Sequence, residues 1–169
     1  WGVSRVPPRR AALLGWAFGT AWIGAGTWWL FISMHRYGGL PAPLAVLAVL
    51  ALAGALSLYL AAAMATVARL RRGQALTDAL LFGACWLAAE LARGLIFTGF
   101  PWLATGYAQV DAPLAAAAPW IGVYGIGALV AALAAGLAFS VGMKRQLIAA
   151  AAVAAIVFAS PLLLQRDFT

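Results

Sequence analysis

Residues 42–68 read APLAVLAVLALAGALSLYLAAAMATVA, an apolar run without one charged side chain. As a helix, this run would rise about 40 Å at roughly 1.5 Å per residue. The hydrocarbon core of a bilayer is only about 30 Å thick, and a spanning helix needs about 20 apolar residues. The run therefore predicts a membrane-spanning helix.

Four further apolar runs surround this one, at residues 11–34, 77–97, 113–142 and 147–164. Ala and Leu dominate them, and the alternating pattern typical of strands is absent. In lipid, a helix satisfies its own backbone hydrogen bonds, whereas an open sheet edge does not. We predict an all-α fold: a polytopic membrane helix bundle with five transmembrane helices, forming one transmembrane domain over residues 1–169.

The composition supports a membrane protein and excludes other classes. Hydrophobic residues make up 66% of the chain and charged residues 9%, against roughly 45–50% and about 25% in soluble proteins. These values exclude a soluble enzyme, a disordered tail and a nucleic-acid-binding domain. The chain begins at Trp1 with no signal peptide, and we expect it to be a fragment of a longer protein.

The basic residues predict the orientation of the chain. Eight of the eleven Lys and Arg residues fall on one side of the predicted membrane: Arg5, Arg9, Arg10, Arg69, Arg71, Arg72, Lys144 and Arg145. The other side holds Arg36, Arg93 and Arg166. Because cytoplasmic loops carry the excess of Lys and Arg, the N-terminus is predicted to be cytoplasmic and the C-terminus periplasmic. The connections at 35–41 and 98–111 then face outward.

Two charged side chains lie inside the third predicted span, within the stretch WLAAELARGLIFTGFPWLATGYAQ at residues 86–109. Glu90 and Arg93 are three residues apart, so they share one helix face and can pair. Counted from Asp78, they lie about 18 and 22 Å along the helix. They either form an ion pair that fixes helix packing or bind a polar headgroup near the outer leaflet.

Aromatic rings are concentrated in the connection that follows. They are Phe97, Phe100, Trp102 and Tyr107, separated by glycines and a proline. An aromatic belt at the membrane interface is one explanation. Four rings within eleven residues favour a shaped loop instead, to which Gln109 and Asp111 add hydrogen-bonding groups.

Small residues and helix-start signals suggest local packing. Gly15 with Gly19, and Ala132 with Gly136, have the four-residue spacing that allows close helix contact. Thr77 is a candidate N-cap, and Asp78 a candidate first-turn acid, for the third span.

Most catalytic and metal signatures are missing from the sequence. Cys85 is the single cysteine and lacks a neighbouring base, and His35 is the single histidine. The run GVYGIG at residues 122–127 lies in an apolar span, so it is not a dinucleotide fingerprint. We therefore predict no metal, no cofactor and no nucleic-acid partner.

The chain resembles the membrane domain of bacterial apolipoprotein N-acyltransferase over nearly its whole length. The most specific part of the resemblance lies in Trp86, Glu90, Arg93, the TGFPW run of Thr98 to Trp102, Gly106, Tyr107 and Gln109. Further matches are Gly15, Trp16, Phe18, Gly19, Trp29, the YGGLP run of Tyr37 to Pro41, Pro113, Pro119 and GVYG at Gly122 to Gly125.

The resemblance implies a fold and an activity for the intact protein. The family has eight spans and a nitrilase-like α/β domain, of which this chain would supply spans three to seven in the bacterial inner membrane. The family's catalytic Cys, Glu and Lys lie in the nitrilase-like domain, so no catalytic residue is expected here. They transfer an acyl chain from a phospholipid to the N-terminal amine of a diacylglyceryl-cysteine lipoprotein. The residues that would bind these lipids are Glu90, Arg93, Phe100, Trp102, Tyr107, Gln109 and Trp29.

Other functions remain open on the residues alone. Glu90 and Arg93 could line the pathway of a small transporter or a substrate-capturing membrane subunit. The chain could also anchor a partner glycosyltransferase or acyltransferase, including one that uses a polyprenol-phosphate sugar. In an anchor, the two charged residues would matter only for folding.

Overall fold

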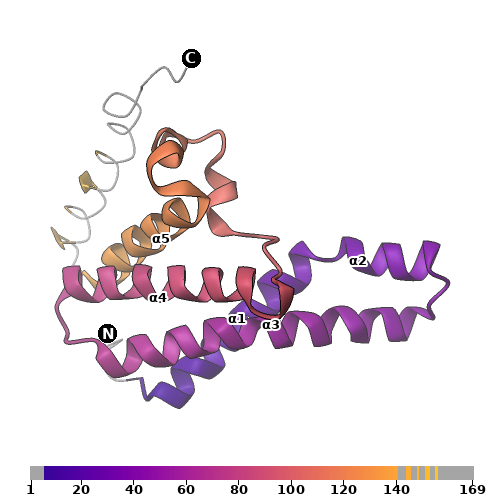
Figure 1. Cartoon of the computed structure of the whole chain (residues 1–169). Coiled ribbons are helices and arrows are strands. Elements are labelled where there is room, and N and C mark those ends of the chain that lie inside the picture. The colour runs from indigo at the N-terminus through magenta and orange to yellow at the C-terminus, as the bar shows by residue number, and fades with distance from the viewer. Residues whose placement is uncertain (1–5, 141–143, 146–147, 149–150, 153–154, 156–169) are drawn as a thin grey trace. The chain divides into compact units, whose positions relative to one another are not determined.

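The computed structural model describes residues 6–140, 144, 145, 148, 151, 152 and 155. These residues are helical with short connections, and no strand occurs among them, which confirms the predicted all-α membrane fold (Figure 1). They form two compact units, one ending at Arg69 and the other beginning at Leu70.

The unit that ends at Arg69 is a helical hairpin. Helix α1 (Pro8–Gly26) is followed by a turn, the short helix α2 (Trp29–Ile32) and a π-helical turn (Ser33–Tyr37). Helix α3 (Ala42–Leu70) then returns, with α2 beside its N-terminal half (Figure 1). The predicted first span thus corresponds to α1, α2 and the π-helical turn.

Close packing holds α1 against α3. A Cβ at Gly19 would lie 2.8 Å from Ser57 Oγ, and one at Gly15 would lie 3.0 Å from the carbonyl oxygen of Leu60. The indole nitrogen of Trp16 donates a hydrogen bond to Gly54 O at 2.9 Å. The close approach predicted for Gly15 and Gly19 is confirmed, because a side chain at either position would displace its neighbours.

The second unit is built on helices α4 (Ala75–Leu95) and α5 (Ala118–Phe139). They pack directly on one another. The helices are joined by 3-10 turns at Ile96–Thr98, Thr105–Gln109 and Pro113–Ala117. A Cβ at Gly83 of α4 would lie 2.8 Å from the carbonyl oxygen of Ala128, so the two backbones nearly touch there.

The beginning of α4 differs from the prediction. Gln74, not Thr77, is the N-cap residue, and the Thr77 hydroxyl donates to Gln74 O at 3.1 Å. Asp78 does lie in the first turn, and its two oxygens accept the backbone N–H groups of Arg72 and Gly73, each at 2.8 Å. A carboxylate that reaches back to two amides fixes the basic turn more firmly than a hydroxyl cap could.

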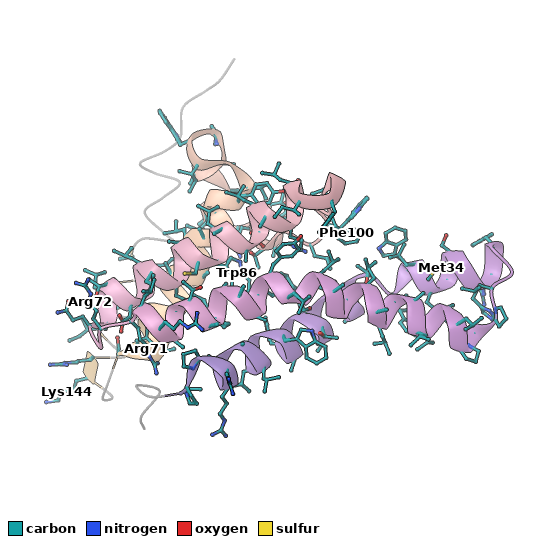
Figure 2. The ribbon with its side chains drawn as sticks, turned by 60° about the horizontal axis from the view of Figure 1, so that its bottom comes forward. Met34, Arg71, Arg72, Trp86, Phe100 and Lys144 are labelled. Carbon is teal, nitrogen blue, oxygen red and sulfur yellow. The ribbon has the colours of Figure 1, made fainter. Side chains whose placement is uncertain are left out.

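Three helices among the described residues are long and apolar enough to cross a membrane: Ala42–Leu70, Ala75–Leu95 and Pro113–Phe139. In the second unit, Arg71, Arg72 and Lys144 lie at one end, and Phe100 lies toward the other (Figure 2). The prediction of a span at 147–164 falls almost entirely outside the described residues.

Candidate functional site

Glu90 binds the loop that follows α4. Its side chain is only 2% exposed, in the second-last turn of the helix. One carboxylate oxygen, Oε1, accepts both the backbone N–H of Thr105 at 2.8 Å and the Thr105 hydroxyl at 2.6 Å. The same hydroxyl accepts a hydrogen bond from the indole nitrogen of Trp86 at 2.8 Å. Thr105 is therefore fixed through its backbone and its side chain together.

Arg93 holds the same loop one turn further along α4. It is 4% exposed, and its Nη1 and Nη2 donate to the carbonyl oxygens of Trp102 and Leu103 at 2.7 and 3.4 Å. Nη2 also lies 3.8 Å from Glu90 Oε1, so the predicted ion pair is present. The contact with the Trp102 carbonyl is much shorter than the ion pair. A buried guanidinium requires such partners because an uncompensated charge is costly in an apolar interior.

We call Trp86, Glu90, Arg93 and Thr105 the polar clasp. Glycine at position 127 of α5 allows this clasp to form, since a Cβ there would lie 2.8 Å from Thr105 Oγ1 and 2.9 Å from Glu90 Oε2. Glu90 Oε2 is buried without a hydrogen-bond partner among the described residues. The clasp thus fills the space between α4, the loop and α5.

The loop backbone held by the clasp is strained. Phe97 and Leu103 have φ angles of 54° and 64°, and Gly99 has a φ of 81°. A positive φ costs energy for residues other than glycine, so such residues adopt it only where the surrounding structure enforces this conformation. The N–H of Phe100 donates to Arg93 O at 2.7 Å and closes the end of α4. Phe97, at the start of this loop, is 92% exposed.

The sequence-predicted site residues fall into distinct groups. Glu90 and Arg93 are buried in the clasp, Trp102 and Tyr107 are 57% and 62% exposed, and Phe100 and Gln109 are half-buried. All six belong to the unit that begins at Leu70. Trp29 belongs to the other unit and is also half-exposed.

Sequence reasoning missed two members of this arrangement. Thr105 was not singled out, although a hydroxyl residue at the end of an aromatic loop is a plausible partner for a buried carboxylate. Gly127 lay in the GVYGIG run, which was considered only as a nucleotide motif. Its role depends on which part of α5 meets the end of α4, and the local sequence does not specify that register.

Cys85 is a free, half-buried cysteine in α4, and His35 lies in the π-helical turn after α2. No group of three or more His, Cys, Asp or Glu side chains that could hold a metal ion occurs among the described residues. His35 Nδ1 lies 2.8 Å from Leu40 O, and its ring stacks on Phe31. Its contacts therefore belong to the turn between α2 and α3.

Comparison with known proteins shows which family the sequence belongs to. The sequence profile of the apolipoprotein N-acyltransferase N-terminal domain matches residues 1–137. Proteins named apolipoprotein N-acyltransferase from Verminephrobacter eiseniae, Ralstonia nicotianae and Pseudomonas putida are 62%, 50% and 48% identical over 74%, 75% and 78% of this chain. The matched part makes up 23%, 25% and 27% of those proteins, so the chain spans about a quarter of their length.

Proposed function

The chain belongs to the apolipoprotein N-acyltransferase family, and we propose that it is membrane-embedded machinery of such an enzyme. The intact enzyme would move an acyl chain from a phospholipid to the N-terminal amine of a diacylglyceryl-cysteine lipoprotein. Within it, the unit that begins at Leu70 would bind and orient the lipid substrates. The thiolate chemistry would belong to residues outside this chain.

The observation that carries this proposal is the loop at residues 97–109. Two buried charged side chains hold it, and Trp102 and Tyr107 on it are exposed. Such rings combine an apolar body with a polar tip, which suits the boundary between acyl chains and headgroups. A rigid loop bearing them would bind lipid at little cost in ordering.

The charge distribution supports an outward-facing loop. Arg71, Arg72 and Lys144 gather at one end of the α4–α5 unit, whereas Phe100 lies toward the other (Figure 2). By the positive-inside rule, the basic end would be cytoplasmic. The aromatic loop would then lie at the periplasmic face of the inner membrane, where lipoprotein substrates would be met.

The test uses the full-length enzyme with Trp102→Ala and Tyr107→Ala, assayed for acyl transfer over a range of phospholipid concentrations. Loss of one ring contact removes about 1–2 kcal/mol of apolar burial, so we expect the KM for phospholipid to rise roughly 5- to 30-fold. Phe18→Ala in α1 is the control, because that ring is 58% exposed and lies outside the loop. Unchanged KM and kcat in both loop variants would refute the proposal.

A further inference from the structure

We propose that Thr105 is a positioning residue of the lipid site, which acts through Glu90 and Trp86 on the loop residues that follow it. The inference rests on the proposed function and names the contact that sets the geometry of the site. Thr105 itself would not touch the substrate. It would fix where Tyr107 and Gln109 stand, and so determine how well a lipid headgroup binds.

The Thr105 hydroxyl uses its donor and an acceptor at once. It donates to Glu90 Oε1 at 2.6 Å and accepts from Trp86 Nε1 at 2.8 Å. A valine has nearly the same shape but can do neither, whereas a serine can do both. The role can therefore be separated from simple packing by exchanging these three residues at one position.

The segment that begins at Thr105 depends on these hydrogen bonds for its orientation. It is a 3-10 helix of five residues, Thr105–Gln109, whose N-cap residue Ala104 provides no side-chain hydrogen bond. Short 3-10 helices have poor hydrogen-bond geometry and little stability of their own. Tyr107 is two residues beyond Thr105, so a small rotation at Thr105 would move the exposed phenol ring.

On the side of the segment that faces α5, the packing leaves no room for movement. A Cβ at Gly106 would overlap the carbonyl oxygen of Val123, so the backbone already touches α5. The native position is therefore set from two sides: by α5 through close contact and by the clasp through hydrogen bonds. Without the hydrogen bonds of the Thr105 hydroxyl, the segment could move, and it could move only away from α5.

The polar clasp also lowers the folding stability relative to an apolar filling of the same space. Within the part of the chain that the structure describes, Glu90 Oε2 is buried without a hydrogen-bond partner, and a buried polar atom in that state costs stability. Replacing a buried ionic group with apolar residues of similar volume is often neutral or stabilising. A directional hold that costs stability is expected where position matters more than stability.

The experiment compares Thr105→Val, Thr105→Ser and Thr66→Val in the full-length enzyme. Thr66 is the matched control, because its hydroxyl makes an exposed hydrogen bond to Ala62 O within α3. For Thr105→Val, we expect the KM for phospholipid in mixed micelles to rise about five- to tenfold with kcat within about twofold, as for the loss of one or two hydrogen bonds. Thr105→Ser and Thr66→Val should both retain the wild-type KM.

Trp86→Phe is a second variant in case Thr105→Val does not fold. It removes the indole donor together with part of the buried ring, and it should raise the KM about two- to threefold. An unchanged KM in Thr105→Val, or in Trp86→Phe if Thr105→Val is not recovered, would overturn the inference, even with lower thermal stability. If Trp102→Ala and Tyr107→Ala raise the KM while the clasp variants do not, only this inference fails. If the ring variants have no effect, the proposed function fails.

Discussion

Gly127 of α5 provides the most direct test of the polar clasp. An alanine there would place its Cβ 2.8 Å from Thr105 Oγ1, 2.9 Å from Glu90 Oε2 and 3.2 Å from the Gly106 nitrogen. Ordinary contacts of a Cβ begin near 3.4 Å, so the two oxygens must each retreat by roughly half an ångström. Neither is the end of a long flexible chain free to move into solvent.

The expected loss of stability follows from these contacts. Overpacking of a well-packed interior costs about 1–3 kcal/mol, and weakening a hydrogen bond to a charged group adds about 1 kcal/mol or more. Alanine regains roughly 0.5–1 kcal/mol of helix propensity over glycine. We therefore expect Gly127→Ala to lower the free energy of unfolding by roughly 1–3.5 kcal/mol.

Gly136→Ala is the matched control on the same helix. Its nearest neighbour would be Ala79 Cβ at 3.7 Å, an ordinary contact, so only the small gain in helix propensity applies. Unfolding of the full-length protein would be followed by titrating SDS into mixed micelles, with apparent melting temperature as a second measure. If Gly127→Ala stayed within about 0.5 kcal/mol of Gly136→Ala, the clasp would be more compliant than its geometry implies.

Two further predictions concern the aromatic loop and the orientation of the chain. Gly99→Ala should reduce the yield and melting temperature of folded protein far more than Gly39→Ala. Both glycines have a positive φ, which costs alanine roughly 1–2 kcal/mol. Only at Gly99 would the new Cβ also overlap a backbone atom, the carbonyl oxygen of Gly94. Equal losses would show that the loop can rearrange. With other cysteines removed, Tyr37→Cys should react with a membrane-impermeant maleimide in intact spheroplasts and Arg72→Cys only after permeabilisation, and the reverse pattern would contradict a cytoplasmic N-terminus.

In the structure, Glu90 and Arg93 bind the loop more closely than they bind each other. The i, i+3 spacing of Glu90 and Arg93 correctly predicted that they pair, but their shortest contacts are with the loop. Arg93 holds carbonyl groups, and Glu90 holds an amide and a hydroxyl. Spacing on one helix reports which side chains share a face, whereas it contains no information on the backbone groups that a distant loop brings to that face.

The sequence by itself determined the class of the protein. The helical class follows from composition along each segment, because a helix in lipid must satisfy its own backbone. The spacing of Gly15 and Gly19 showed that this face of α1 could be approached closely, but not by which helix. The family was equally visible in the stretch from Trp86 to Gln109.

Only the tertiary structure decided how the site is held. Thr105 meets Glu90 because the chain turns back over α4 through residues with positive φ. Gly127 becomes essential only because α5 packs against that point. These contacts join separate helices and a loop, and their energies depend on distances of a few tenths of an ångström, which no local pattern of residue types specifies.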